Sequence, residues 1–162
     1  MEDKHYVGAV IWRRNAATHR LEVLVMDVTS TYKDKHSGEQ KISGPHVKFI
    51  GGMRRLPEDT IEVSLTREIV EETYLRYSGP LQELGEPIPV RDRGNRSVID
   101  HVKRGFLVPF DQCTGELRTE TLIDDNDEMS PPRWEPIDEV GRYLYSTHQP
   151  FLLRAQDALA FS

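Results

Sequence analysis

The chain has 162 residues, with 27 acidic and 21 basic side chains that leave a net charge of −6. This balance excludes a protein whose main task is to coat nucleic acid, because that affinity comes from Lys and Arg neutralising phosphates. Cys113 is the single cysteine, which excludes a disulfide framework and a Cys-rich zinc site. No apolar stretch approaches the ~20 residues of a membrane span, and the first residues lack a signal-peptide layout. We therefore expect a cytoplasmic protein with one domain over residues 1–162 and without membrane or bulk nucleic-acid partners.

The first third of the chain predicts a sheet. Short β-branched runs at 6–12 and 21–28 are typical of two neighbouring strands, and 46–50 is a third candidate. The segment 29–45 between them is rich in Ser, Lys, Gly and His, which predicts a long loop. Long loops inside compact domains are often functional, so we expect this loop to be mobile.

The next segment, 59–76, predicts a helix. Ile61, Leu65 and Ile69 recur every four residues, and the pattern ends before Ser78-Gly79-Pro80. The helix begins either at Asp59, which with Glu62 resembles a capping box, or at Thr60.

The second half of the chain mixes strands and short helices. Strands are expected at 82–90 and 98–110, on either side of a basic turn at 91–96. The segment 124–128 reads as an acidic loop, and Pro131-Pro132 breaks the chain after it. Two short helices are expected at 137–145 and 150–160.

Three glutamates of the predicted helix carry the candidate chemistry. Spacings of three and four place Glu68, Glu71 and Glu72 on adjoining turns, where their charges repel. A solvated face with the pairs Arg67–Glu71 and Glu72–Arg76 is the structural explanation. It leaves Glu68 without a positive neighbour on the helix, and it places Glu68 and Glu72 beside the apolar stripe. A Mg²⁺ ion, which takes carboxylates and substrate phosphates as ligands, is the functional explanation.

The residues before this helix give the pattern a specific context. Gly52, then Glu58 or Asp59, then Arg67-Glu-Ile-Val-Glu-Glu-Thr73 resembles the signature of the Nudix hydrolases. The match departs from the family pattern in two places. Asp59 has the family spacing from Arg67 and Glu58 has it from Gly52, so the loop carries one inserted residue. Tyr74 stands where the family has a glycine.

A later segment extends the resemblance to nearly the whole chain. The run from Asn126 to Val140, with Trp134-Glu-Pro136 inside it, is similar to the family's acidic loop, Trp-any-Pro strand and closing helix. The resemblance therefore implies the family's α/β/α sandwich, an α+β fold with a mixed β-sheet between helices.

The resemblance also implies an activity and a set of site residues. Nudix enzymes hydrolyse a nucleoside diphosphate linked to another moiety and use Mg²⁺ or Mn²⁺. By resemblance the metal ligands are Glu68, Glu71, Glu72 and the carbonyl of Gly52, while Arg67 orients the glutamates. The general base is Glu68 or Glu128, and Glu58 or Asp59 supports the site. A small nucleotide-type substrate is implied, and a homodimer fits the family.

Several basic residues are candidates for binding the substrate phosphates. They are Arg54 and Arg55 beside the glutamates, and Arg91, Arg93, Arg96, Lys103 and Arg104 on the later strand pair. Trp12 or Tyr6 could stack a base, although a core role is expected for both. Two alternatives to an enzyme stay open: a Nudix-fold module that binds a nucleotide without cleaving it, and an α/β domain whose acidic helix face is structural.

Overall fold

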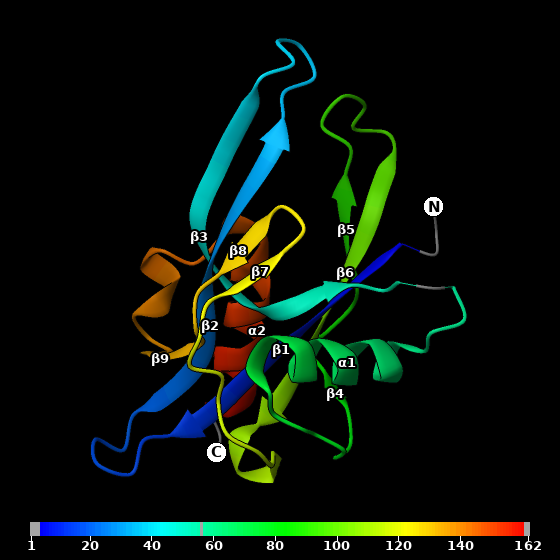
Figure 1. Cartoon of the computed structure of the whole chain (residues 1–162). Helices are drawn as coiled ribbons and strands as arrows, with labels where there is room; N and C mark the ends of the chain where they lie inside the picture. Colours follow the sequence, from blue (N-terminus) through cyan, green and yellow to red (C-terminus); the bar gives the residue numbers. More distant parts are fainter. Residues whose placement is uncertain (1–3, 56, 161–162) are drawn as a thin grey trace.

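The computed structural model describes residues 4–55 and 57–160 and is built on one mixed sheet (Figure 1). Its strands are β1 (His5–Arg14), β2 (Leu21–Lys33), β3 (Gln40–Met53), β4 (Gln82–Glu83), β5 (Ile88–Arg91), β6 (Ile99–Pro109), β7 (Leu122–Asp124), β8 (Asp127–Met129) and β9 (Arg133–Pro136). The central order is β4-β6-β1-β3-β2-β8-β7, with β5 added to β6 and β9 added to β2. β1 and β6 run parallel, whereas the other pairs are antiparallel.

Helices cover both faces of this sheet. Alternation along β1 sends Val7, Ala9 and Ile11 to the face covered by α1 (Ile61–Thr73), where Leu65 and Ile69 pack. The intervening Val10 points to the opposite face, which α2 (Gln149–Leu159) covers. Figure 1 shows α1 in front of the sheet and α2 behind it. The α/β/α sandwich predicted from the resemblance is therefore confirmed.

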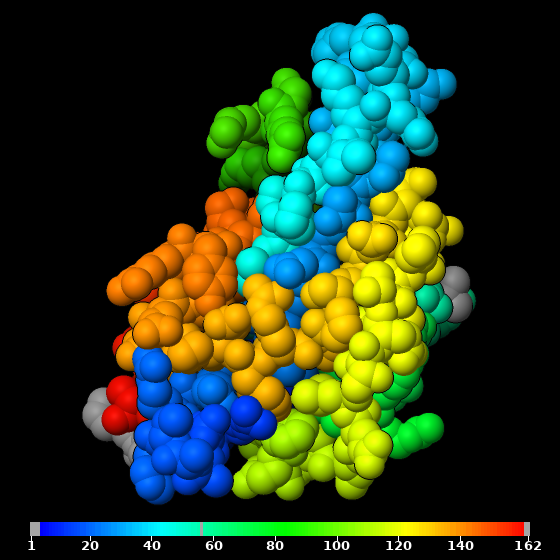
Figure 2. All heavy atoms as spheres, turned by 60° about the vertical axis from the view of Figure 1, so that its left-hand side comes forward, coloured from blue at the N-terminus to red at the C-terminus, as the bar shows by residue number. Residues whose placement is uncertain are grey.

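The predicted loop at 29–45 is wrong, because most of it forms the end of a long hairpin. β2 and β3 stay paired from Val28↔His46 to Lys33↔Gln40, and the turn between them is short. The Asp34 side chain accepts bonds from the N–H groups of His36 and Ser37, and Gly38 adopts a φ of +73°. Figure 2 shows this hairpin (cyan) and the β5–β6 hairpin (green) projecting from the same end of the molecule.

The C-terminal third also differs from the sequence prediction. The helix expected at 137–145 is wrong: the segment instead contains the 3-10 turn η2 (Val140–Arg142), and a second turn, η3 (Ser146–His148), follows it. The strand expected at 82–90 is divided into β4 and β5 at Gly85, whose φ of +71° breaks the extended chain. α2 agrees with the helix predicted at 150–160. Among the described residues no helix has the length and apolar character needed to span a membrane.

Candidate functional site

The glutamate-bearing helix α1 has well-defined ends. It begins after Thr60, whose hydroxyl accepts a hydrogen bond of 3.1 Å from the Val63 N–H, so Thr60 rather than Asp59 is the N-cap. It ends at Tyr74, which has a φ of +68° and donates its N–H to the Val70 carbonyl. This left-handed cap is the position where the family signature has a glycine, and a tyrosine there carries a steric cost.

Two of the three helix carboxylates are buried against the end of β3. Glu68 is 7% exposed and Glu72 is 8% exposed. The Gly51 N–H donates a 2.8 Å hydrogen bond to Glu72 Oε1. A Cβ atom on Gly52 would lie 2.5 Å from Glu68 Oε2, so only glycine allows this carboxylate its place. Gly52 is thus explained by the packing of the Glu68 carboxylate, whereas Gly51 is explained by the close approach of β1, because a Cβ atom there would lie 2.4 Å from the Val7 carbonyl oxygen.

Burial and mutual repulsion disfavour the charged forms of these two groups. Burial raises the pKa of Glu72 well above its usual value, and the charges of Glu68 and Glu71 add to that rise. Burial also raises the pKa of Glu68, with Glu71 adding to it and Arg67 opposing it. The site therefore concentrates negative charge where water solvates it poorly, which a bound cation would relieve.

Arg67 ties the third glutamate and the preceding loop to this pair. Its guanidinium lies 2.9 Å from Asp59 Oδ2, 3.4 Å from Glu68 Oε1 and 3.9 Å from Glu71 Oε1. Asp59 is therefore the acidic residue of the loop that contacts Arg67, whereas Glu58 is exposed. The predicted pair between Glu72 and Arg76 is wrong: no ion pair joins them within the described residues, and Glu72 bonds Gly51 instead.

A cleft of about 720 Å³ opens over these side chains. One wall is formed by the end of β3 with α1, including Arg55 and the three glutamates, and the other by the β7–β8 hairpin. Glu71 is the most exposed of the three glutamates, and its carboxylate lies 3.1 Å from Arg55 Nη2. An arginine and three carboxylates thus face the same space.

The acidic segment predicted as a loop is the tip of the β7–β8 hairpin, and it brings different residues to the cleft than expected. Asp124, Asp125 and Asp127 line the cleft. Glu128 is exposed, pairs in register with Thr29 and does not line the cleft, because neighbouring residues of a strand point to opposite faces. The structure therefore does not place the predicted base Glu128 at the site. A hairpin pattern with its turn at Asp125-Asn126 was the signal that could have identified Asp127.

The predicted phosphate-binding arginines are mostly elsewhere. Of the six arginines and one lysine named as candidates, Arg55 is the one that lines the cleft among the described residues. Arg104 is held by Glu83 through bonds of 2.6 and 2.7 Å, and Arg54 Nη1 lies 3.5 Å from the Asp59 carbonyl. Arg91 and Arg93 are exposed on the β5–β6 hairpin. Strand position alone did not show which side chains reach the glutamates.

A buried arginine joins the two walls of the cleft. Arg118 is 2% exposed. It donates 2.8 Å bonds to the carbonyls of Glu72 at the end of α1 and Ser130 after β8, and it also bonds the carbonyl of Glu120. The α1 wall and the hairpin wall are therefore held together by one guanidinium.

The donor set of the cleft fits a hard divalent cation. Carboxylate oxygens and a backbone carbonyl are the ligands that Mg²⁺ and Mn²⁺ prefer, and two of the carboxylates are buried with raised pKa values. In the described part of the chain, no three His, Cys, Asp or Glu side chains are grouped closely enough to hold a metal ion. Glu71 is turned toward Arg55 and Arg67, so it would have to leave these partners to join Glu68 and Glu72.

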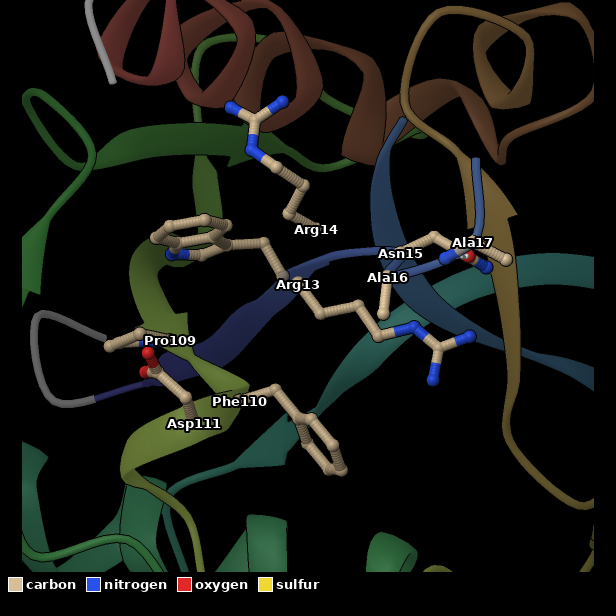
Figure 3. A pocket seen from close by; sticks show the side chains of 9 residues that line it. Arg13, Arg14, Asn15, Ala16, Ala17, Pro109, Phe110 and Asp111 are labelled. Carbon is tan, nitrogen blue, oxygen red and sulfur yellow. Dashed lines mark hydrogen bonds between the residues drawn. The ribbon is translucent and has the colours of Figure 1, made fainter. Parts of the chain in front are cut away.

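A second cavity of about 730 Å³ lies at the β1–β2 turn and the short helix η1 (Phe110–Gln112), remote from the glutamates (Figure 3). Its principal cation, Arg13, is neutralised by Glu22 at 2.8 Å and stacks on Trp134 at 4.3 Å. This cavity has no group of carboxylates like that of the cleft, so the chemistry of the molecule is concentrated over α1.

The sequence matches no protein-family model and no curated protein. The structure is similar to a NUDIX hydrolase from Nitrosomonas europaea, with a TM-score of 0.64, 14% identity, and coverage of 96% of this chain and 88% of that chain. It is similar to the NUDIX domain of Shewanella oneidensis NrtR complexed with ADP ribose, with a TM-score of 0.59, 18% identity, and coverage of 96% and 87%. It is also similar to a C. elegans Ap4A hydrolase, with a TM-score of 0.57, 14% identity, and coverage of 98% of both chains. The chain therefore has the fold of the Nudix hydrolases.

Proposed function

We propose that the protein hydrolyses a pyrophosphate bond in a nucleoside diphosphate linked to another moiety, in a reaction that needs Mg²⁺ or Mn²⁺. The observation that carries this proposal is the pair of buried carboxylates, Glu68 and Glu72, packed against Gly51-Gly52 beneath an open cleft. The likeness to a domain complexed with ADP ribose and to an Ap4A hydrolase supports a nucleotide-type substrate.

The residues of the cleft have different proposed roles. Glu68, Glu71, Glu72 and the Gly52 carbonyl would hold the metal, which when bound lowers the pKa of a water molecule and neutralises phosphoryl oxygens. Arg67 orients Glu68 and Glu71 through its contacts of 3.4 and 3.9 Å. Arg55 is placed to bind a substrate phosphate, and doing so would release Glu71 from their ion pair.

Glu68 is the base that we propose for accepting the proton of the attacking water. It lines the cleft, and burial raises its pKa toward the range where a carboxylate accepts protons effectively. Asp59 supports the site indirectly, because it fixes Arg67 at 2.9 Å. The acidic composition and the single cysteine support a cytoplasmic location. We also propose a homodimer, which size-exclusion chromatography tests.

The experiment is a phosphate-release screen with nucleoside triphosphates, ADP-ribose, nucleotide sugars, dinucleoside polyphosphates and capped RNA, with Mg²⁺ or Mn²⁺ and coupling enzymes for each product. We expect turnover that depends on the metal and that Glu71→Gln lowers by at least about 100-fold, as expected for loss of a charged ligand. Glu62→Gln, on an exposed part of the same helix, is the matched control and should keep the wild-type rate. Equal rates for Glu71→Gln and wild type would overturn the assignment.

A nucleotide-binding module without turnover is the second candidate. The observation that favours it is the Arg55–Glu71 ion pair, which occupies one of the proposed metal ligands. Tyr74 in place of the family's glycine points the same way. Binding of a nucleotide from the panel by a folded protein that releases no product would select this alternative.

A further inference from the structure

A smaller side pocket of about 230 Å³ opens from the cleft. The two cavities share the end of β3 together with Glu72, Asp127 and Met129, so they adjoin one another. Beyond this shared boundary, the side pocket is lined by Tyr6 of β1, Met26 and Val28 of β2, and Lys48 of β3. A ligand that extends from the cleft into this adjoining pocket would meet Lys48.

Two polar groups of the side pocket make no hydrogen bond to a described residue. The Lys48 ammonium lies 4.6 Å from the centre of the Tyr145 ring and makes no hydrogen bond or ion pair with a described residue. The Tyr6 hydroxyl also makes no hydrogen bond within the described residues, and a Cβ atom on Gly51 would lie 2.6 Å from it. An ammonium and a hydroxyl are both hydrogen-bond donors, and here both line one small cavity.

A buried lysine lies against the ring of Tyr6. Lys103 is 8% exposed, its Nζ lies 4.6 Å from the centre of the Tyr6 ring, and it donates a 2.9 Å hydrogen bond to Thr147. No carboxylate of the described residues pairs with it. Burial and the charge of Lys48 lower the pKa of Lys103 to about 8, and burial lowers the pKa of Lys48. A buried cation close to a second, half-buried one is costly, and a bound anion would offset that cost.

Two carboxylates lie at the boundary between the cleft and the side pocket. Glu72 accepts the Gly51 N–H and is a proposed metal ligand, whereas Asp127 accepts a 2.7 Å hydrogen bond from Ser30. Both raise the pKa of Lys48 and therefore favour its charged form. The Lys48 ammonium and the Tyr6 hydroxyl are the groups of the side pocket that favour an anion, and the charges of these two carboxylates oppose one.

The size of the side pocket limits what this anion can be. Cavities that enclose a whole small-molecule ligand usually have about 300–1,000 Å³, so about 230 Å³ suits a phosphoryl group better than a nucleoside. We propose that Lys48 and Tyr6 bind a terminal phosphoryl group of a substrate whose scissile pyrophosphate lies over the glutamates. This inference rests on the proposed function and narrows it to nucleoside triphosphates and longer polyphosphates, in preference to substrates in which a neutral sugar follows the diphosphate.

The kinetic test compares two substrates that share adenosine diphosphate, ATP and ADP-ribose, with the purified full chain. We expect Lys48→Met to lower kcat/KM for ATP by about tenfold or more and to change that for ADP-ribose by less than about threefold, because a charge-assisted hydrogen bond is lost only with ATP. Lys48→Arg should retain most of the ATP activity. Lys33→Met, an exposed lysine of β2, is the matched control. An equal loss for both substrates, or no loss for either, would overturn the proposal.

A binding test separates this proposal from the proposed function. Inorganic tripolyphosphate is titrated calorimetrically into the protein in EDTA, so that no metal-dependent turnover contributes. We expect Lys48→Met to weaken this binding by about tenfold or more while the thermal melt stays cooperative. If tripolyphosphate binding depends on Lys48 but the protein hydrolyses no substrate, the phosphoryl site at Lys48 is supported and the proposed hydrolase activity is contradicted. If the protein turns over a substrate but Lys48→Met does not weaken tripolyphosphate binding, the hydrolase activity is supported and the phosphoryl site is contradicted.

Discussion

The two α-helices of the sandwich bury very different surfaces. α2 buries Phe151, Leu152, Ala155 and Leu159, all of them apolar. α1 buries Leu65 and Ile69 but also Ser64, Glu68, Glu72 and Thr73. Two of the buried polar atoms that have no hydrogen-bond partner in the described residues, Ser64 Oγ and Arg67 Nε, also belong to α1.

This difference means that α2 contributes mainly to stability, whereas α1 contributes to the candidate chemistry. A helix that buries only apolar groups lowers the free energy of the folded state without polar penalties. A helix that buries carboxylates gives up part of that gain, which is typical of functional sites because they need charges that water does not solvate. Changes on the α2 side should therefore lower stability and leave the chemistry intact. Changes at the buried charges of the α1 side should alter the chemistry, and removing a buried charge should relieve a polar penalty.

The largest effect is expected from Phe151→Ala on α2. The ring is 4% exposed and packs against Gly105, where a Cβ atom would lie 2.3 Å from Phe151 Cδ1. We expect the free energy of unfolding to fall by about 3–5 kcal/mol, measured by urea denaturation. Leu153→Ala, at a position that is 63% exposed, is the control and should change it by less than about 0.5 kcal/mol. The activity per folded molecule should stay at the wild-type level, and a selective loss of activity would break the comparison.

Lys103→Met should raise the free energy of unfolding rather than lower it, and the size of this increase should depend on pH. The folded pKa of about 8 lies below the ~10.4 of an unfolded lysine, so between these values only the unfolded chain keeps the proton. The wild-type protein therefore gains stability as the pH rises from about 8 to about 10, and below pH 8 it bears the full penalty, on the order of 3 kcal/mol.

Removing the charge of Lys103 should remove this penalty. At pH 7 we expect the variant to be more stable than wild type, with the gain reduced by loss of the bond to Thr147, and at pH 10 the difference should shrink. Urea denaturation at both pH values measures it, with Lys33→Met as the exposed control. If the difference in the free energy of unfolding between the two proteins does not change with pH, the charge of Lys103 does not destabilise the folded state.

The smallest effect is expected from Tyr74→Gly at the end of α1. A non-glycine residue with a φ of +68° costs roughly 1–2 kcal/mol, and the variant loses the bond from the Tyr74 hydroxyl to Glu120. We expect a net gain of about 1 kcal/mol in the free energy of unfolding, read from the thermal midpoint. Tyr74→Phe separates the two terms because it removes only the hydrogen bond. A less stable Tyr74→Gly protein would mean that the Glu120 contact outweighs the backbone strain.

The sequence predicted the elements whose patterns are local. The four-residue repeat of Ile61, Leu65 and Ile69 gave α1, and their spacing placed Glu68 and Glu72 at its buried edge. The long hairpin was missed because Ser, Lys and Gly residues resemble a loop when strand pairing beyond a short turn is not known. The region before α2 was missed because it consists of 3-10 turns that carry no periodic signal.

The side chains facing the glutamates were harder to predict because they come from distant parts of the chain. Asp127 lines the cleft and Lys48 lines the adjoining side pocket only because β8 and β3 are both paired with β2. A strand residue changes face with a shift of a single position, so Glu128 and Asp127 could not be separated without the register. Nothing in the residues around Lys48 indicates that its ammonium faces the carboxylates of another element.

Arg118 has a consequence for how the cleft can vary between related sequences. Its hydrogen bonds to the two sides of the cleft end on main-chain carbonyls, those of Glu72, Glu120, Met129 and Ser130, which every amino acid supplies. These bonds therefore hold the two walls together whatever side chains the walls carry. Substitutions along the β7–β8 hairpin can change the side chains that face the cleft without loosening the contact between its walls.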